Sequence, residues 1–315
     1  MAASISVVIP AHNAASFIGE ALDSVFAQGI EDIEVVVVDD GSTDGTADVA
    51  ARHAGGGAGG RVQVIRQQGA GSGRARNRGL AATSAPLVAF LDADDLWAPS
   101  KTRLQLEVLE RRPELAMVFS DMVAFRGDLT ERTTYFQQRG FDGRCTLSSI
   151  FLYDMISTPT VLARRTCLEA AGPFDESLRI GQDTDLWFRL ARLFPFDVVD
   201  RPLVRRRFHG GNVTRDSRLL ARCVEEVWGR YMGLCLEREP GSRDALTAHF
   251  DRIRWNHMFE EGCGLRREGR AREARRCLQK AIALRPARWR AWAFWAATFL
   301  GPSKTAGGTP LERTR

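Results

Sequence analysis

The sequence predicts an α/β fold, in which a doubly wound, mainly parallel sheet is followed by a C-terminal α-helical extension. Residues 87–91 are five apolar residues in a row, residues 33–38 are rich in β-branched side chains, and carboxylates follow both runs. Helical patterns separate these strands, and from about residue 216 the pattern is helical. We therefore expect an α/β domain over residues 1–215, a helical extension over 216–300 and a flexible tail over 301–315.

Three carboxylates follow the strand at 87–91 within four positions: Asp92, Asp94 and Asp95. A buried strand belongs in the middle of a parallel sheet, and open α/β sheets bind ligands at the carboxyl edge of such strands. At an effective dielectric constant of ~20, two like charges ~4 Å apart repel by about 4 kcal/mol, which a divalent cation with oxygen ligands relieves. The pattern predicts a site for a cation and a phosphate, with a solvated acidic loop as the alternative interpretation.

Local signals define the other elements of the α/β domain. Pro10 ends a first strand that starts at residue 5, and Asn13 is placed to cap a helix that runs to about residue 28. The turn at 41–46 contains Ser and Thr residues that suit the start of a helix. Further along we expect a strand at 62–65, a helix from about 74, a helix from Pro99 to about 111, a strand at 115–125, loops and short strands over 126–150, a helix beginning around Asp183, and a strand at 196–204.

Residues 69–73 form a glycine-rich loop before a predicted helix. A dinucleotide-binding turn has Gly-x-Gly-x-x-Gly or Ala here, because the last position packs the helix closely on the strand. Arg74 or Arg76 occupies that position in either register, so an oxidoreductase is a poor second interpretation. The glycines together with Arg74, Arg76 and Arg78 still suit a diphosphate at the N-terminus of the helix.

Composition limits the class of protein. Residues 1–200 have 19 basic and 27 acidic side chains, whereas residues 201–315 have 25 basic and 12 acidic ones. The basic part predicts an anionic partner, either phospholipid or a phosphorylated substrate, or else a solvated Arg-rich surface; no nucleic-acid motif accompanies it. No apolar run reaches the ~18 residues of a membrane span, residues 1–10 show no secretory signal, and the six cysteines form no CxxC pair. We therefore expect a cytoplasmic protein.

Four segments now resemble the family 2 glycosyltransferases. They are residues 6–13 (SVVIPAHN), 37–46 (VVDDGSTDGT), 75–80 (ARNRGL) and 90–95 (FLDADD). The resemblance implies a GT-A fold for the domain at 1–215, an inverting transfer reaction, a nucleotide-sugar donor and a divalent metal, Mg²⁺ or Mn²⁺. A UDP-sugar is the expected donor, and a saccharide, a lipid-linked molecule or a protein is the expected acceptor, as in the synthesis of cell-envelope polysaccharides.

The resemblance also implies roles for individual residues on the donor side. The positions that match base and ribose contacts are Pro10, Ala11, Asn13 and Asp40. Asp92, Ala93 and Asp94 form the Asp-x-Asp motif, in which Asp92 faces the ribose and donor sugar and Asp94 binds the metal. Gly71 falls where the family has Asn-x-Gly, although Gly69 stands in place of the usual Asn.

On the acceptor side, Asp183 matches the residue taken as catalytic base in the family. The family usually shows Glu-Asp here, whereas this chain has Gln182, which removes a negative neighbour of Asp183. A helix-capping carboxylate is the alternative role for Asp183. Asp185 is expected to be structural or solvated, and His209 matches a position that can contact the metal or the diphosphate. The arginines at 205–207 just before it would neutralise phosphate, or else form a solvated basic turn.

The helical extension resembles one tetratricopeptide helix pair over residues 258–286, with small residues where two helices cross. One apolar face of a last helix at 288–300 comprises Trp289, Trp292, Trp295, Ala296, Phe299 and Leu300. This face either packs on the preceding helices or contacts a membrane surface, which would place the protein at the inner face of the membrane. Two rivals to the transferase remain: a nucleotidyltransferase that releases pyrophosphate, and a catalytically silent nucleotide-sugar-binding scaffold.

Overall fold

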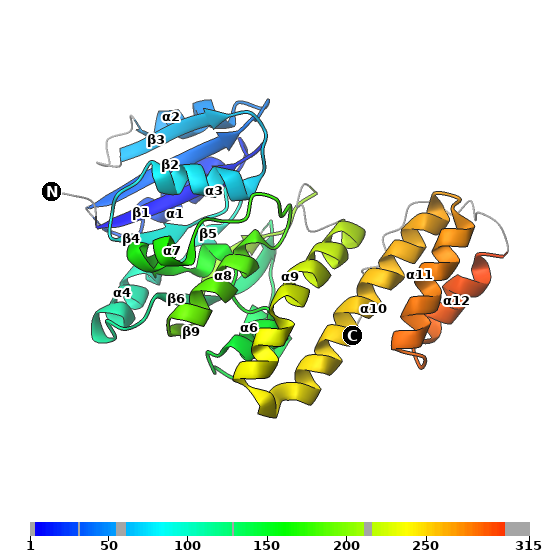
Figure 1. Cartoon of the computed structure of the whole chain (residues 1–315). Coiled ribbons are helices and arrows are strands. Elements are labelled where there is room, and N and C mark those ends of the chain that lie inside the picture. The colour runs from blue at the N-terminus through cyan, green and yellow to red at the C-terminus, as the bar shows by residue number, and fades with distance from the viewer. Residues whose placement is uncertain (1–3, 31, 55–60, 128, 211–215, 300–315) are drawn as a thin grey trace. The chain divides into compact units, whose positions relative to one another are not determined.

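The computed structural model describes residues 4–299 except residues 31, 55–60, 128 and 211–215. The chain divides into two compact units, of which the first comprises Met1–Val213 and Arg230–Leu246 and the second comprises Thr214–Gly229 and Thr247–Arg315. The first unit has the predicted α/β architecture and the second is helical (Figure 1). The expected tail at 301–315 lies outside the described residues, and the expected domain boundary after residue 215 stays a prediction.

The described strands form one mixed sheet with the order β3-β2-β1-β4-β8-β6-β9-β5, and β7 pairs with β6. β1, β2, β3 and β4 run parallel, whereas β8 is antiparallel to β4 and β6. The strands are β1 (Ile5–Ala11), β2 (Ile33–Asp40), β3 (Arg61–Gln67), β4 (Leu87–Phe90), β5 (Leu96–Trp97), β6 (Met117–Arg126), β7 (Leu129–Thr130), β8 (Leu162–Arg164) and β9 (Phe196–Arg207). The carboxyl ends of β1, β2 and β4 therefore lie at one edge.

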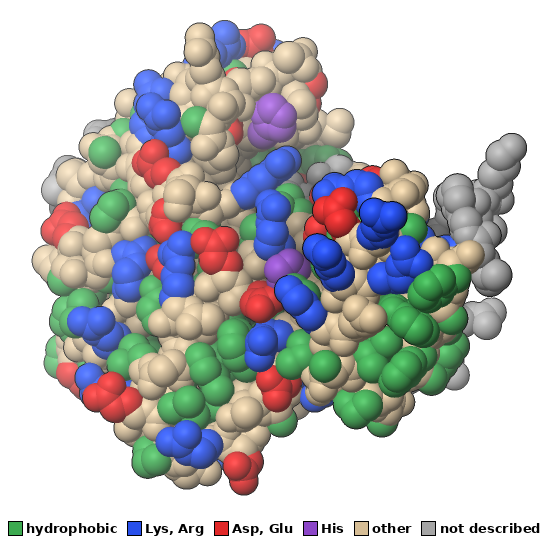
Figure 2. All heavy atoms as spheres, turned by 45° about the vertical axis from the view of Figure 1, so that its right-hand side comes forward, with side chains coloured by type: hydrophobic (Ala, Val, Ile, Leu, Met, Phe, Trp, Pro, Cys, Tyr) green, Lys and Arg blue, Asp and Glu red, His purple; other side chains and the backbone are tan. Residues whose placement is uncertain are grey.

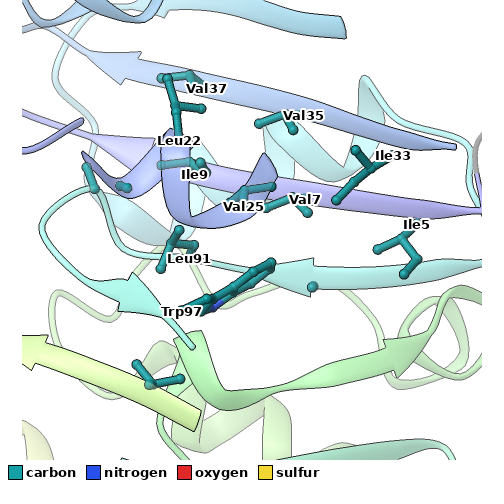
Figure 3. Packing of buried hydrophobic residues seen from close by; sticks show 14 of the residues in the cluster. Ile5, Val7, Ile9, Leu22, Val25, Ile33, Val35, Val37, Leu91 and Trp97 are labelled. Carbon is teal, nitrogen blue, oxygen red and sulfur yellow. The ribbon is translucent and has the colours of Figure 1, made fainter. Parts of the chain in front are cut away.

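Hydrophobic packing fixes the parallel half of the sheet. On one face, Leu22 and Val25 of α1 (Ile18–Phe26) join the core formed by alternate residues of the strands (Figure 3). On the other face lies α3 (Ser72–Ala81), where a Cβ built on Gly79 would come within 2.4 Å of a methyl carbon of Val8. Only glycine permits this close approach of helix to strand, so the N-terminus of α3 is held at the carboxyl edge of the sheet.

The other helices of the first unit follow the strands in chain order. They are α2 (Thr46–Ala54), α4 (Lys101–Arg111), α5 (Tyr135–Arg139), α6 (Leu147–Tyr153), the 3₁₀ helix η1 (Thr158–Thr160), α7 (Arg165–Ala171) and α8 (Gln182–Leu193). The prediction of only loops and short strands over 126–150 is wrong, because this region contains α5 and the start of α6. Each begins with a capping box, at Thr134 and at Thr146, which stabilises a short helix.

The expectation that Asn13 caps α1 is also wrong. α1 starts at Ile18, and Asn13 has a positive φ of 50°. Its backbone N–H donates to the Ser42 hydroxyl, and its Oδ1 accepts from the Thr43 backbone N–H at 3.0 Å. A short polar side chain tolerates this conformation because it can bond locally, and here it ties the end of β1 to the turn after β2.

The second unit consists of helices and parts of helices. The sequence continues through α9 (Ser217–Arg238), the 3₁₀ helix η3 (Pro240–Ser242), α10 (Arg243–Arg267), α11 (Ala271–Leu284) and α12 (Trp289–Ala297). A Cβ on Gly262 of α10 would lie 2.7 Å from Cγ of Leu278 on α11, so these helices approach closely where a small residue was expected. The likeness to a tetratricopeptide pair stays a prediction. Within the described residues, no helix is long and apolar enough to cross a membrane.

Three of the apolar side chains that we expected to share a face of the last helix lie together, because the rings of Trp292 and Phe299 are 6.3 Å and 5.2 Å from the ring of Trp295. Ala291, Phe294 and Trp295 pack with residues of α10 and α11, whereas Trp289 and Phe299 are 73% and 59% exposed. Trp295 therefore packs on the preceding helices, whereas Trp289 at the start of α12 is mostly exposed. Leu300, which was placed on the same face, lies outside the described residues.

Candidate active site

Asp40 organises the glycine-rich loop at the carboxyl edge of the sheet. Its Oδ1 accepts hydrogen bonds from Gln67 Nε2 and from the Ala70 backbone N–H, and its Oδ2 accepts from the Gly71 N–H, each at 2.8 Å. Gly71 has a φ of 91°, a conformation that side-chain-bearing residues rarely adopt. A carboxylate has about four acceptor sites, so Asp40 can still accept one bond from a ligand.

The end of β1 lies beside Asp40 through the parallel register of the sheet. Pro10 is opposite Val38, and Ala11 is opposite Asp39, the residue before Asp40. Ala11 is buried and Pro10 is partly exposed. Together with the bond from Asn13 to the 42–43 turn, this brings the base-side residues of the sequence prediction to one place.

Asp92 forms an ion pair with Arg76 at the end of β4. Nη2 of Arg76 lies 2.7 Å from Oδ1 of Asp92, and only 6% of the Arg76 side chain is exposed. The guanidinium also lies over the ring of Phe174, and its buried Nε has no hydrogen-bond partner among the residues that the structure describes. A buried guanidinium with a free N–H beside a partly exposed carboxylate suits an anionic or hydroxyl-bearing ligand. Ala93 is buried in the hydrophobic core, so only its backbone can face such a ligand.

Asp94 pairs with His209, which comes from the segment after β9. Nε2 of His209 lies 2.8 Å from Oδ2 of Asp94, and about a quarter of each side chain is exposed. Burial raises the pKa of the Asp94 carboxyl, the negative charge of Asp92 raises it further, and the hydrogen bond with His209 opposes both. A cation bound at this carboxylate would relieve its repulsion with Asp92.

Asp95 differs from its two acidic neighbours because it is fully buried and serves the fold. Its Oδ1 accepts the backbone N–H of Arg207 at 2.9 Å, and burial raises its pKa well above the usual value. Nε of Arg207 donates to the Asp94 carbonyl, and Nη2 pairs with Glu20 at 2.7 Å. Arg207 is one of three arginines that the basic run at 205–207 suggested as phosphate ligands, yet in this structure it joins β9 to the acidic loop.

Asp183 lies in the first turn of α8 and is bonded to η1. Its Oδ2 accepts the hydroxyl of Thr158 at 2.7 Å, and its Oδ1 accepts the backbone N–H of Thr184 at 2.9 Å. Within the described part of the chain Asp183 makes no ion pair, and its side chain is only partly buried. The carboxylate is thus fixed in orientation while its charge is not neutralised.

Asp185 has the opposite environment. Its side chain is 4% exposed and pairs with Arg189 at 2.9 Å and with Arg230 at 3.2 Å, and Tyr231 Oη donates to it at 2.8 Å. Of the two expectations for Asp185, structural or solvated, the structure supports the structural one. Gln182 is buried and donates to the Ser72 hydroxyl, so it ties the start of α8 to the start of α3.

Several residues of this region were not found from the sequence. Thr158 follows no motif, and only the fold brings it to Asp183. Asp154 at the end of α6 is near enough to Asp183 for their charges to interact, and burial raises its pKa to about 6. Its positive φ of 47° could not be read from the sequence either.

No group of three or more His, Cys, Asp or Glu residues that could hold a metal ion occurs among the residues that the structure describes. Asp94 and His209 form a smaller group, a carboxylate and an imidazole within 2.8 Å of each other. Such a pair fits a cation that also binds oxygens of a phosphorylated ligand, as Mg²⁺ commonly does.

Comparison with known proteins identifies related sequences. The sequence profile "Glycosyl transferase family 2" matches residues 6–169, just over half of the chain. An uncharacterized glycosyltransferase of Rickettsia typhi is 27% identical over 75% of this chain and 73% of its own length, and one of Nostoc sp. is 33% identical over 66% of each chain. Chondroitin synthase of Escherichia coli is 26% identical over 67% of this chain but only 30% of its own.

Solved structures share the fold. Residues 1–349 of Staphylococcus aureus TarS superpose with a TM-score of 0.60 at 19% identity, covering 94% of this chain and 89% of that one. The mannosyltransferase PcManGT of Pyrobaculum calidifontis, in complex with GDP-Man and Mn²⁺, gives a TM-score of 0.60 at 20% identity, covering 95% and 87%. The α/β unit thus has the GT-A fold, and the chain belongs to glycosyl transferase family 2 and is a glycosyltransferase.

Proposed function

We propose that this enzyme transfers a sugar from a UDP-sugar to an acceptor hydroxyl, with inversion at the anomeric carbon and with a divalent metal. The observation that carries this proposal is the contrast between Asp183 and Asp185. An inverting transfer needs one carboxylate that can take a proton, and Asp183 is fixed by Thr158 but unpaired with any described cation. Asp185 cannot serve, because two arginines neutralise it.

The donor is assigned to the carboxyl edge of the sheet. Pro10, Ala11, Asn13 and Asp40 would bind the base and ribose, and Gly71 with Arg76 would lie at the diphosphate. Asp92, Ala93 and Asp94 would face the ribose, the sugar and the metal. This assignment is supported by relatives in fold: TarS has been solved in complex with UDP and with UDP-GlcNAc, and PcManGT with GDP-Man and Mn²⁺.

Asp94 and His209 are the proposed metal ligands. They lie within 2.8 Å of each other, and the pKa of Asp94 is raised first by burial and then by the negative charge of Asp92. When bound, Mg²⁺ or Mn²⁺ would stabilise the charge on the departing diphosphate. The protein residues then have separate tasks, since the Asp94 region holds the donor and Asp183 acts on the acceptor.

The reaction follows from these positions. The acceptor hydroxyl gives its proton to the Asp183 carboxylate, and its oxygen forms a bond to the anomeric carbon from the face opposite the diphosphate. The bond between that carbon and the diphosphate oxygen breaks, which releases UDP. No covalent enzyme intermediate is needed, so a single carboxylate is sufficient.

The decisive experiment measures products. Purified protein is incubated with UDP-sugars and Mn²⁺, with and without saccharide acceptors of the kind found in cell-envelope polysaccharides, and UDP and pyrophosphate are assayed. Acceptor-dependent UDP release is the expected result. In a parallel incubation with a nucleoside triphosphate and a sugar phosphate, pyrophosphate release would instead identify a nucleotidyltransferase. Donor binding without either product would identify a silent scaffold.

We further propose that the second unit contacts an anionic membrane surface, where lipid-linked acceptors would be found. Trp289, Trp292 and Phe299 are exposed, and residues 265–299 contain ten basic but only two acidic side chains. Exposed hydrophobic and basic side chains also lie next to each other on the face drawn in Figure 2. Tryptophans at the interface and arginines at lipid phosphates are the combination that favours peripheral binding.

Vesicle sedimentation tests this contact with the full chain. Binding to phosphatidylglycerol vesicles but not to neutral phosphatidylcholine vesicles is expected, and Trp289→Gln with Phe299→Gln should abolish it. Leu193→Gln, which alters an exposed leucine of α8, is the matched control and should bind normally. Unchanged binding of the double variant would contradict the proposal, and concentration-dependent dimers that the double variant loses would assign the face to a second copy.

A further inference from the structure

A group of buried polar side chains lies beneath η1 and has no part in the proposed chemistry. Lys101 and Gln105 on α4 are completely buried, and Trp97 on β5 is 4% exposed. Trp97 lies in the hydrophobic core below the parallel strands (Figure 3). Burying polar groups is costly unless each finds a partner, so their hydrogen bonds show what they support.

Two of these side chains bind the backbone of η1 directly. Trp97 Nε1 donates to the Pro159 carbonyl at 2.9 Å, and Gln105 Nε2 donates to the Thr160 carbonyl at 2.7 Å. The same amide nitrogen also donates to the Val118 carbonyl of β6 at 3.1 Å. Two successive backbone carbonyls of η1 thus accept hydrogen bonds from buried side chains of the core.

Lys101 fixes the orientation of Gln105. Its Nζ donates to Gln105 Oε1 at 2.9 Å, so the amide oxygen faces the ammonium group and the amide nitrogen must face η1. Nζ also lies 4.1 Å from the centre of the Trp97 ring, a cation–π distance. One lysine therefore contacts both side chains that hold the turn.

η1 also makes a hydrogen bond to α8. Thr158 is 1% exposed, and its hydroxyl donates to Asp183 Oδ2 at 2.7 Å. Thr160, at the other end of the same turn, directs its hydroxyl to the Ser157 carbonyl instead. Of these two threonines, only Thr158 transmits the position of the turn to a carboxylate.

We propose that Lys101, Gln105 and Trp97 act through η1 and Thr158 as a positioning network for the Asp183 carboxylate. The inference rests on the proposed role of Asp183 as the base. A proton acceptor that is displaced by 1 Å can lose ~100-fold in rate, and groups at a reacting centre are held best when their supports are packed rigidly. The network gives a reason for a lysine to be buried although no described carboxylate pairs with it.

The test distinguishes a loss of Asp183 positioning from a loss of protein stability and from a loss of the base itself. Thr158→Val keeps the shape of the side chain and removes the hydroxyl, so kcat should fall ~10–100-fold with little change in the KM of donor or acceptor. Thr158→Ser restores the hydroxyl and should recover kcat to within a few-fold. Thr102→Val is the matched control, since the buried Thr102 hydroxyl bonds Gln28 outside the network, and its kcat should stay near wild type.

The same substitution made in an Asp183→Asn variant shows whether the proposed base or the proposed network is wrong. In Asp183→Asn, adding Thr158→Val should cause little further loss, because both changes remove the same function. If Asp183→Asn transfers sugar at the wild-type rate, the proposed base and the network are both wrong. If Asp183→Asn is inactive while folded Thr158→Val is as fast as wild type, only the network is wrong. Equal losses in Thr158→Ser and Thr158→Val would also overturn it.

Discussion

His209 Nε2 lies 2.8 Å from Asp94 Oδ2, although 115 positions separate the two residues in the sequence. The contact arises because the two-residue strand β5 pairs with β9, with Leu96 opposite Arg205. Asp94 lies two residues before β5 and His209 two residues after β9, so this one pairing brings the acidic loop and the histidine together. The short strand is therefore the element that builds the proposed metal site.

Loss of the metal should abolish donor binding. Without a cation the carboxylate of Asp94 repels a diphosphate, so calorimetry with a UDP-sugar should detect binding in Mn²⁺ and none in EDTA. Asp94→Asn should lose binding in Mn²⁺, and His209→Ala should weaken it by at least ~10-fold, the loss that even a supporting partner of a metal ligand causes. Equal donor affinity in Mn²⁺ and EDTA would refute the metal assignment.

Removing the base should affect rate but not donor binding. Asp183→Asn keeps the shape of the side chain and removes its basicity, which typically costs ~10²–10⁴-fold, or about 3–5 kcal/mol in activation free energy. We expect at least ~100-fold slower transfer with donor affinity near wild type, measured by acceptor-dependent UDP release and by calorimetry. Transfer at the wild-type rate would place the base elsewhere.

Asp185→Asn should show the reverse pattern. The carboxylate joins α8 to Arg230 and Tyr231, so the loss of its charge should lower the free energy of unfolding by about 2 kcal/mol, as expected for hydrogen bonds to a charged group. The folded fraction should retain kcat within a few-fold. Thermal unfolding and active-site-normalised kinetics check both parts, and a rate loss as large as that of Asp183→Asn would contradict the structural role.

The buried Lys101 should make stability depend on pH. Burial lowers its pKa to about 7, whereas in the unfolded chain it is ~10.4. Between these values the unfolded chain binds the extra proton, so the free energy of unfolding should rise as pH increases from about 7 to about 10, by an amount on the order of 4 kcal/mol. In Lys101→Met this rise should disappear from urea titrations across that range, and an unchanged pH profile would show that Lys101 does not titrate there.

The strands at the donor site could be predicted because their signals are local. β1, β2 and β4 are apolar runs that end in proline or carboxylates, and the helix after the glycine loop follows as expected. α5 was missed although Thr134 and Gln137 form a capping box, so that signal was present in the sequence. Asn13 was misassigned because its side chain bonds a turn 30 residues away rather than the next helix.

The positions of the other site residues depend on contacts between residues far apart in the sequence, which no local pattern encodes. Thr158 and Asp183 are 25 residues apart, and their bond requires η1 to be held by Trp97 and Gln105 from earlier elements. Arg207 was predicted to be a phosphate ligand because the sequence alone does not show whether an arginine in such a run pairs with a carboxylate or faces solvent. In the structure it pairs with Glu20. The sequence could therefore name the chemistry of the site but not the residues that position it.

The chain passes from one compact unit to the other within α9 and again within α10, because residues 230–246 belong to the α/β unit. Arg230 and Tyr231 bind Asp185, and Tyr231 also stacks on Phe188 at 4.5 Å. A gene rearrangement that joined the first 215 residues to a foreign C-terminal sequence would leave α8 without these partners. We therefore expect the helices to be inherited together with the transferase during evolution, rather than exchanged as an independent cassette.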